Sequence, residues 1–593
     1  MEAREREFKF LATEGRVTVP FFQRTYVWEQ ENWENLLQGL FSKSNGHFLG
    51  SIILKQISAP SGESKKLEVV DGQQRLTTLS ILVKALYDIF PQTLQQNSKD
   101  EMRQVLFSKV SPTSSDYYVK IEHSQVDKEA YEMVIRANID GNPPIEIEKI
   151  DKNSHRIEQC YKYFCEILKA KSEKEKENLF NKILNPNNKM LVVIDLVEEK
   201  DDEQAIFDTL NTAGVRLTTA EIIKNALYQK IIEKLGREDA INFYKHTWEK
   251  TFLSDENTVK YWEKEKITGR LKRDNLEILL HSVAIIKGFF DPDKHILSDL
   301  SKLYKERIQR AEADELKTFV NEIIEYAEIY RGKFSDFDKS TLFTFEDSVT
   351  RLFHVLEELK ISTFHPFILY VFKEFGNSEE EIKNILASLE RFVVRRMIAR
   401  QVTRNYNKYC KEFINTHESI LEKLKETTEQ DISNGLREIS NKNATLLLFW
   451  VELYRRYKGI AYDVKELKFT YSLEHIMPQK WEEHWKDIPE KYKPDDSKMT
   501  EEESKKDRYE KVYWIGNMTL LRSDLNSVLQ NFTFEKKMKG EGQKKGIKEY
   551  ADLLITKDDI VEPYNKGDKN WDEKKIEERT NKLEKEIMEI WKF

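Results

Sequence analysis

The spacing of apolar residues predicts alternating strands and helices in the first part of the chain and mostly helices after it. Residues 67–70 form a short apolar run with a β-branched bias, which is typical of a buried strand. Gly72 interrupts this run, and apolar residues then recur at helical spacing from Leu76 to Leu86. The stretch LEVVDGQQRLTTL therefore predicts a strand, a tight turn and a helix.

The same two patterns recur elsewhere in the first 230 residues. Further strands are predicted at His47–Leu54, Tyr117–Ile121 and Met190–Val197. Gly50 in the first of these allows close approach to the backbone, and an amphipathic helix is predicted at Trp33–Phe41. Further on, one helix is expected to end near Asn211, and Thr218 with Glu221 forms a capping box that starts the next helix.

From about residue 231 to 440 the pattern is helical. Apolar residues recur at three- and four-residue steps in Leu276–Ile286, Leu352–Leu359, Phe364–Phe375 and Ile382–Ile398. Within this body Arg396, Arg400 and Arg404 follow one another at intervals of four residues, which predicts one basic stripe along a helix. The stripe is the local candidate for contact with DNA phosphates. A solvated or salt-bridged helix face is the alternative interpretation.

Composition and charge restrict the class of protein. A chain of 593 residues with 39% hydrophobic residues exceeds one hydrophobic core, so several domains are expected. The formal net charge of −8 gives no global basic signature, so any contact with DNA must be local. Three cysteines (Cys160, Cys165 and Cys410) form neither a disulfide framework nor a zinc motif. With no apolar signal core or membrane-spanning run, we expect a soluble cytoplasmic protein that binds no membrane.

The polar residues of the predicted turn suit phosphate chemistry. The N-terminus of a helix offers unpaired N–H groups and the positive end of the helix dipole, so anions bind there readily. Arg75 adds a forked donor for phosphate, and Asp71 could hold a magnesium ion or polarise a water molecule. Gln23 and Arg24, just before the helix at Trp33–Phe41, are candidates to converge with Arg75. The alternative is a polar turn whose amides only cap the helix.

The DGQQR turn after a strand, together with FFQRTYVW at Phe21–Trp28, resembles the N-terminal domain of GmrSD-type restriction enzymes, which cut modified phage DNA. That domain resembles the ParB and sulfiredoxin nucleotide-binding fold, and the family assigns nucleoside triphosphate hydrolysis to this turn. Asn211 occupies the family position where a helix ends in "LN", although a plain capping role is equally open. The resemblance implies that GTP or ATP binds at Gln23, Arg24, Asp71, Gly72, Gln73, Gln74, Arg75 and Asn211.

Two segments near the C-terminus carry a second set of reactive side chains. YSLEHIMPQ at Tyr471–Gln479 predicts a strand that bears Glu474 and His475. YWIGNMTLLRSDLNSVLQNFTFEKK at Tyr513–Lys537 predicts a second strand, a polar turn and a helix after Asn526. Histidine suits proton transfer near neutral pH, and carboxylate and amide oxygens suit magnesium or manganese as a divalent metal.

This order of elements resembles the ββα-metal nuclease pattern called HNH, which the C-terminal domain of GmrSD-type enzymes also carries. The resemblance implies His475 as the general base of phosphodiester hydrolysis and Glu474 and Asn526 as metal ligands. Asn517 would tie the loop that bears His475, in a structural role. A single chain that holds both modules is similar to GmrSD fusions and to SspE, a phosphorothioate-sensing defence protein.

Together these observations predict a multidomain α+β protein. It comprises a ParB/sulfiredoxin-like NTP-binding domain at 1–230, an α-helical body at 231–440 and an HNH nuclease domain at 441–593. The expected function is a nucleotide-regulated, modification-dependent DNA endonuclease, a type IV restriction enzyme of antiphage defence. The expected partners are double-stranded, modified phage DNA and a nucleotide, with a homodimer left open. The alternative is a non-cleaving, ParB-like regulator that binds DNA in a nucleotide-dependent manner.

Overall fold

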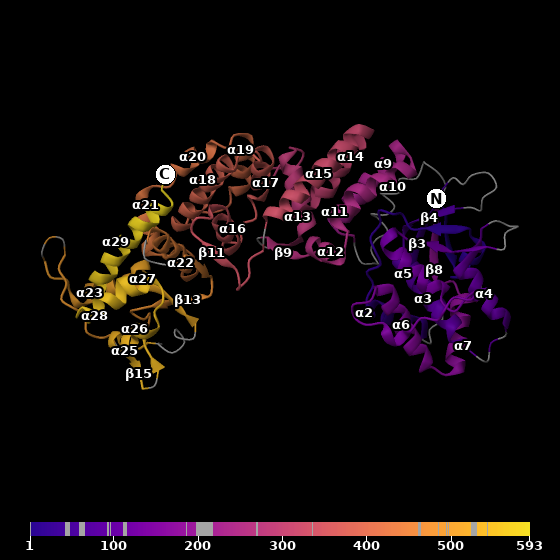
Figure 1. Ribbon diagram of the computed structural model, residues 1–593, viewed down its shortest axis with the longest axis horizontal. Helices are drawn as coiled ribbons and strands as arrows, with labels where there is room; N and C mark the ends of the chain where they lie inside the picture. The colour runs from indigo at the N-terminus through magenta and orange to yellow at the C-terminus, as the bar shows by residue number, and fades with distance from the viewer. Residues whose placement is uncertain are drawn as a thin grey trace. The chain divides into compact units, whose positions relative to one another are not determined.

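The chain forms two compact units, Met1–Tyr244 and Lys245–Phe593 (Figure 1). The structure, a computed structural model, describes residues 2–592 apart from 42–47, 58–65, 92–93, 95, 111–115, 186, 197–216, 269–270, 335, 460–463, 484, 494, 496, 524–530 and 543. Of the helical body predicted at 231–440, residues 231–244 belong to the first unit, and the rest shares the second unit with the C-terminal module.

A mixed sheet forms the centre of the first unit. Its strands are β1 (Glu2–Arg6), β2 (Arg16–Thr18), β3 (Gly50–Ile57), β4 (Lys66–Asp71), β7 (Ile121–Glu122) and β8 (Leu191–Leu196). They lie in the order β1-β8-β3-β4-β2-β7, with β3 antiparallel to β4 and parallel to β8. The predicted strands that became β3, β4 and β8 are confirmed. The segment predicted at Tyr117–Ile121 is divided between β6 (Tyr117–Val119), which pairs with β5 (Phe107–Lys109), and β7.

Helices gather on one face of this sheet, below the strands in the view of Figure 1. They are α2 (Gln30–Phe41), α3 (Gln73–Asp88), α4 (Gln96–Leu106), α5 (Gln125–Arg136), α6 (Arg156–Lys169) and α7 (Glu173–Leu184). Helix α3 is central because it packs against α4, α5, α6 and α7, and nearly all its side chains are buried. Cys160 and Cys165 lie in this core on α6. The turn at 71–75 is thus attached to the most buried helix of the unit.

Two further helices, α9 (Thr219–Leu235) and α10 (Arg237–Tyr244), complete the first unit. The Thr218 hydroxyl accepts a hydrogen bond from the N–H of Glu221, and the Glu221 carboxylate accepts one from the N–H of Thr218, so the predicted capping box is confirmed. The helix predicted before it, and with it Asn211, lies outside the described residues.

The second unit begins with a helical array. Its longer helices are α12 (Glu256–Trp262), α13 (Asn275–Ile286), α14 (Leu300–Arg310), α15 (Ala313–Lys333), α16 (Ser348–Glu358), α17 (His365–Glu374), α18 (Glu379–Ile398), α19 (Tyr406–Asn415), α20 (Ser419–Leu424), α21 (Glu429–Arg437) and α22 (Asn441–Lys458). All four helices predicted in this region are confirmed. A hairpin of β9 (Glu265–Thr268) and β10 (Leu271–Asp274) was not predicted, because its short charged strands carry no apolar alternation. Among the described residues, no helix is long and apolar enough to cross a membrane.

The C-terminal part of this unit contains the predicted strand pair. Strand β13 (Tyr471–His475) runs antiparallel to β14 (Met518–Arg522), and His475 lies opposite Met518. Between the two strands lies α23 (Glu501–Lys511), and after them come α25 (Phe534–Lys539) and α29 (Glu573–Ile590). Helix α29 packs on the turn at Ile515–Asn517. Strand, strand and following helix therefore occur in the expected order. The polar turn with Asn526 lies outside the described residues.

Candidate functional site

The first candidate site is the turn between β4 and α3. Gly72 stands before the first residue of α3 with a φ of 91°, in the left-handed region that favours glycine. A Cβ at this position would lie 2.9 Å from the carbonyl oxygen of Ser51. Gly72 has no side chain that could cap the first turn of α3. A helix N-terminus next to a close-packed strand is a suitable place for an anion.

The glutamines of the turn hold the FFQRTYVW segment in place. Gln74 donates to the carbonyl of Thr25 (3.0 Å) and accepts from the N–H of Val27 (2.9 Å). Gln73 donates to the carbonyl of Arg24 (2.8 Å). From the other side, Gln23 donates to the carbonyl of Val69 in β4 (2.6 Å). These side-chain amides join two segments through backbone groups, which is the structural interpretation of the turn.

Arg75 approaches β3 through a gap that only glycine provides. Its Nη1 donates to the carbonyl of Ser51 (2.8 Å). A Cβ added to Gly50, whose φ is 112°, would lie 2.6 Å from Nε of Arg75. The predicted close approach at Gly50 is confirmed, and the approaching group is the guanidinium of Arg75.

Beside these hydrogen bonds, the turn holds charged and polar groups that could contact a ligand. Burial raises the pKa of Asp71, while the N–H of Gly72 and the charges of Arg75 and Arg24 oppose the rise. Arg24 and Arg75 therefore both lie near the same carboxylate, whereas Gln23, the third residue expected to converge on phosphate, donates to the backbone of β4. The Oε1 atom of Gln73 is buried and has no hydrogen-bond partner among the described residues. The polar groups of the first candidate site are the amides at the start of α3, the Oε1 atom of Gln73 and the Asp71 carboxylate.

The second candidate site lies at the end of β13. The Glu474 carboxylate is buried and forms an ion pair through Oε1 with Nζ of Lys537 on α25. Lys537 is 1% exposed and also donates to the carbonyl of His475 (2.7 Å). Lys537 is therefore a buried partner of this strand and not a solvated side chain. Burial raises the pKa of Glu474, and the ammonium of Lys537 opposes this rise.

His475 is half-buried beside this pair. Burial, and then the positive charge of Lys537, lower the pKa of His475 to about 4. The ring is consequently neutral near pH 7, in the form that can accept a proton, but it is a weaker base than an unperturbed histidine. The prediction of a general base had relied on the ordinary pKa of the side chain.

Asn517 ties the loop after His475, as predicted. Its Oδ1 accepts from the N–H of Met477 (2.9 Å) and from Nε1 of Trp571 (3.1 Å). Its Nδ2 donates to the carbonyls of Met477 (2.8 Å) and Val512 (2.9 Å). The side chain is fully buried. Every hydrogen-bonding position of the amide is used, so Asn517 acts through structure and not through contact with substrate.

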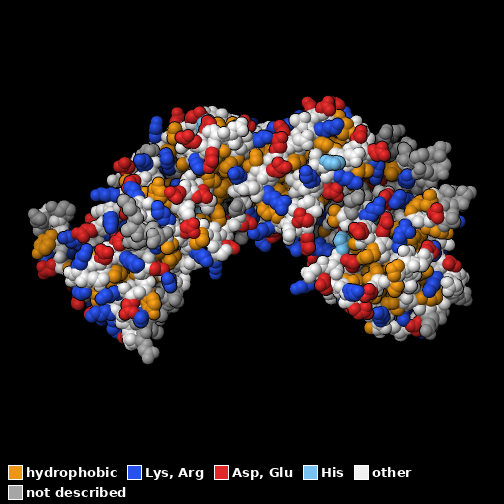
Figure 2. All heavy atoms as spheres, in the orientation of Figure 1, with side chains coloured by type: hydrophobic (Ala, Val, Ile, Leu, Met, Phe, Trp, Pro, Cys, Tyr) orange, Lys and Arg blue, Asp and Glu red, His pale blue; other side chains and the backbone are white. Residues whose placement is uncertain are grey.

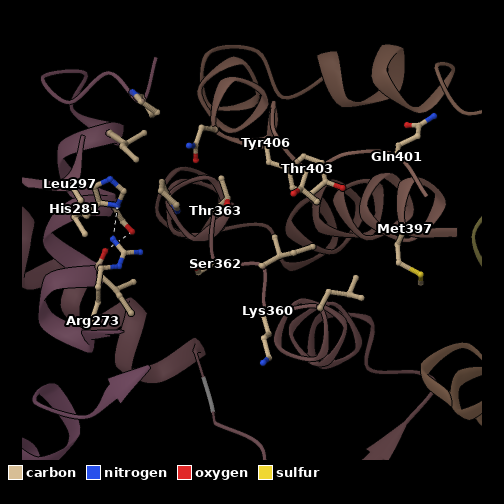
Figure 3. Close-up of a pocket in the computed structure, with 18 of the residues that line it drawn as sticks. Arg273, His281, Leu297, Lys360, Ser362, Thr363, Met397, Gln401, Thr403 and Tyr406 are labelled. Carbon is tan, nitrogen blue, oxygen red and sulfur yellow. Dashed lines mark hydrogen bonds between the residues drawn. The ribbon is translucent and has the colours of Figure 1, made fainter. Parts of the chain in front are cut away.

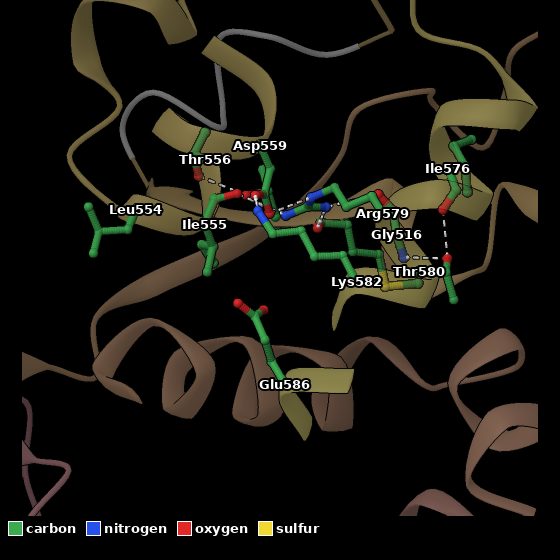
Figure 4. A network of polar contacts seen from close by, with 12 residues as sticks. Gly516, Leu554, Ile555, Thr556, Asp559, Ile576, Arg579, Thr580, Lys582 and Glu586 are labelled. Atoms are coloured by element: carbon green, nitrogen blue, oxygen red, sulfur yellow. Dashed lines mark hydrogen bonds and ion pairs between the residues drawn. The ribbon is translucent and has the colours of Figure 1, made fainter. Parts of the chain in front are cut away.

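Helix α29 also holds this turn, which no pattern in the sequence indicated. Arg579 donates to the carbonyls of Gly516 (2.8 Å) and Met518 (2.5 Å), on either side of Asn517. Thr580 accepts from the N–H of Gly516 (3.2 Å). Figure 4 shows Arg579 within a network that includes the carboxylate of Asp559. The pattern at 573–590 indicates only a charged amphipathic helix. Its contacts with the turn at Ile515–Asn517 show that it helps to position strand β14.

One predicted metal ligand is described and the other is not. Lys537 contacts Oε1 of Glu474, which leaves Oε2 as the oxygen that a divalent cation could bind. A carboxylate oxygen of this kind suits magnesium or manganese as one ligand of several. Asn526 lies outside the described residues. Within the described part of the chain, no group of three His, Cys, Asp or Glu side chains is arranged to hold a metal ion.

The basic stripe predicted on one helix is wrong. Helix α18 ends at Ile398, and Arg400 takes a φ of 55°, so Arg400 and Arg404 lie beyond the helix. Arg396 is 6% exposed and packs over the rings of Phe392 and Tyr409. The stripe assumed an unbroken helix, but no glycine or proline marks where this helix stops. Figure 2 shows Lys and Arg side chains intermixed with Asp and Glu over the visible face of the protein.

Comparison with known proteins places both candidate sites within recognised domains. The family model for the N-terminal domain of GmrSD restriction endonuclease matches residues 8–228, and the model for the C-terminal domain of GmrSD restriction endonucleases matches residues 396–586. An uncharacterised protein of Methanocaldococcus jannaschii is 25% identical over 281 residues, which cover 42% of this chain and 45% of that protein. The chain thus spans less than half the length of this relative. The matched domains include the turn at 71–75 and the strand that bears Glu474 and His475.

Proposed function

The chain belongs to the GmrSD family of restriction endonucleases, and from this premise we propose that it is a nucleotide-regulated endonuclease that cuts modified DNA. The observation that carries the proposal is the end of β13, where Lys537 pairs with the carboxylate of Glu474 and holds the carbonyl of the next residue, His475, on a strand whose following loop is fixed by Asn517. The nucleotide site and the nuclease site are in separate compact units. Hydrolysis of the nucleotide and cleavage of DNA are therefore proposed as two distinct reactions of one chain.

The nuclease reaction is proposed at His475. In its neutral form the imidazole removes a proton from the water that attacks the phosphodiester. A bound magnesium or manganese ion would supply charge neutralisation of the scissile phosphate, held by Oε2 of Glu474 and by Asn526. Lys537 opposes the rise in the pKa of Glu474 that burial causes, and it holds the backbone carbonyl of His475. This arrangement is an HNH-type site in chemical terms.

The nucleotide reaction is proposed at the turn between β4 and α3. The amides at the start of α3 would receive the phosphates of GTP or ATP, and Arg24 and Arg75 would neutralise their charge. Asp71 would orient the attacking water or a magnesium ion. Gln73, Gln74 and Gln23 would act by holding the loop that closes the site.

One observation favours a second function, a DNA-binding regulator that does not cleave. Lys537 already pairs with Glu474, and the pKa of His475 is lowered to about 4, so both groups are weaker reactants than isolated side chains. In a regulator the strand pair would serve as a binding fold, and the nucleotide turn alone would react. The two functions differ in one measurable property, which is strand cleavage.

The experiment is a cleavage assay on plasmids of one sequence that carry no modification, hydroxymethylcytosine, glucosylated hydroxymethylcytosine or phosphorothioate linkages. Each plasmid is incubated with the full chain, magnesium or manganese, and GTP, ATP or no nucleotide. Nicking or linearisation of at least one modified plasmid, lost on addition of EDTA, is the expected result. Binding and nucleotide hydrolysis without cleavage under every condition would favour the regulator. The same assay is run on His475→Ala, which should not cleave, and on His417→Ala, a histidine substitution in the helical body that should cleave like the wild type.

A further inference from the structure

A cavity of about 980 Å³ lies within the helical body of the second unit, apart from both candidate sites. It is lined by α13, by the segments that follow α16 and α18, and by the start of α22. Figure 3 shows Arg273 and His281 on one side, Thr403, Tyr406 and Met397 on the other, and Ser362 and Thr363 between them. The volume is at the upper end of the range of about 300–1,000 Å³ for cofactor and small-molecule sites.

Positive charge exceeds negative charge in the lining. Arg273, Lys360 and Arg400 carry the cations, and Glu438 is the one carboxylate in the described lining. Arg400 forms an ion pair with Glu438, but both side chains are well exposed, so the pair is weak and an anion can exchange with the carboxylate. In a chain with a net charge of −8, this excess of cations is a local feature that suits an anionic ligand.

Two of these cations occupy a backbone conformation that disfavours side chains. Four described non-glycine residues have a positive φ, and two of them, Lys360 at 56° and Arg400 at 55°, line this cavity. Each follows a helix end closed by a backbone hydrogen bond, from Ile361 to Leu356 (2.8 Å) and from Gln401 to Arg396 (2.9 Å). Glycine is the usual residue here because it has no Cβ penalty.

A helix C-terminus favours a nearby cation, and this is the simpler explanation for a basic residue at position 360 and at position 400. The helix dipole does not explain why each cation stands at the one position of its helix end where the backbone is left-handed. It also does not explain why both residues line the same cavity. Strained residues of this kind cluster at ligand sites, where the side chain compensates for its conformational cost.

We propose that the cavity binds a nucleoside phosphate, with its phosphate between Lys360 and Arg400. The apolar part of the lining provides a seat for a planar heterocycle and consists of Ile278, Ile285, Phe290, Leu297 and Met397. Ser362, Thr363 and Gln401 supply both donors and acceptors for its polar edge. The nucleoside phosphate is either free or a unit of DNA turned out of the duplex. Since no residue of either candidate catalytic site lines the cavity, the proposal goes beyond the proposed function.

The decisive variant is Lys360→Gly, because the two explanations predict different outcomes. Glycine relieves the left-handed conformation, so the variant should melt at or above the wild-type temperature. If Lys360 holds phosphate, binding should weaken about tenfold, as expected for one charge-assisted hydrogen bond. Lys360→Glu should weaken it further. Asn138→Gly, also left-handed but in the first unit, should leave binding unchanged.

Binding is measured on the full chain by calorimetry with two probes. One is a series of free nucleoside mono- and triphosphates, and the other is a short DNA duplex with one mismatched, easily extruded nucleotide. If Lys360→Gly weakens one free-nucleotide site and retains the second, the cavity binds a free nucleotide. If only duplex binding is weakened, the cavity binds a nucleotide of DNA. Unchanged binding of both probes in Lys360→Gly and Lys360→Glu would overturn the proposal. A nucleotide site that disappears only in Arg75→Ala belongs to the turn, so failure of the two proposals can be distinguished.

Discussion

Replacing Asn517 with alanine should destabilise the second unit far more than replacing His475 does. Asn517 is fully buried, and its amide makes four hydrogen bonds to the backbone of Met477 and Val512 and to the indole of Trp571. Alanine would leave all four partner groups without the amide. Because the side chain joins the loop after β13 to the turn before β14, the loss falls on the geometry around His475.

The magnitude follows from the number of bonds. A hydrogen bond contributes about 1 kcal/mol net, and a buried partner left unsatisfied costs about 1–3 kcal/mol. The four losses share one cavity and do not add fully, so we expect a decrease of about 4 kcal/mol in the free energy of unfolding. That is a large fraction of the ~5–15 kcal/mol typical of a native protein, so Asn517→Ala should remain folded only at moderate temperature.

The assay is urea unfolding followed by tryptophan fluorescence, with linear extrapolation to water. His475→Ala is the matched comparison, because His475 is half-buried and its side chain makes one long hydrogen bond within the described residues, 3.5 Å to Gln479. Its cost should be within about 1 kcal/mol, as for substitutions outside tightly packed networks. Both variants should lose cleavage, but only Asn517→Ala should lose stability. A cost below about 1 kcal/mol for Asn517→Ala would refute the structural role assigned to this residue.

Two further predictions concern charge and packing. Burial would raise the pKa of Asp559, but Arg579 and Arg455 hold it at about 2, below its usual 3.8; this lowered value contributes about 2 kcal/mol above pH 4 that is lost as pH falls from 4 to 2. Urea titrations of wild type and Asp559→Asn should differ by an amount that shrinks over that interval, and a constant difference would contradict the pairing. Gly50→Ala should displace the neighbouring guanidinium and weaken nucleotide binding, whereas Gly141→Ala, with the same sign of φ but nothing within 4 Å, should not; equal binding in both variants would count against the turn as the nucleotide site.

Local patterns predicted the elements well, because their signals are contained in short stretches. The apolar run at 67–70, the glycine after it and the helical spacing that follows determine β4, the turn and α3 without help from distant residues. The tie made by Asn517 was implied by the resemblance to the HNH pattern and not by the local sequence.

Distant packing determined what the sequence could not predict. Gln73 and Gln74 have side chains equally suited to bind phosphate or backbone, and only the fold shows that their amides reach the segment at 24–27. Helix α18 stops where Arg400 takes the conformation usual for glycine, so the stripe through Arg400 had no visible end in the sequence. The support that α29 gives to the turn at 515–517 depends on residues more than 50 positions away in sequence.

The most direct test of the account is metal-dependent cleavage by His475→Ala. Wild type and variant are purified in parallel, checked for equal unfolding free energy, and assayed on a modified plasmid that the wild type cuts, with nucleotide hydrolysis measured in the same samples. The account predicts that His475→Ala releases phosphate from GTP or ATP at the wild-type rate but leaves the plasmid intact. Nicking of the plasmid by the variant at the wild-type rate would contradict it.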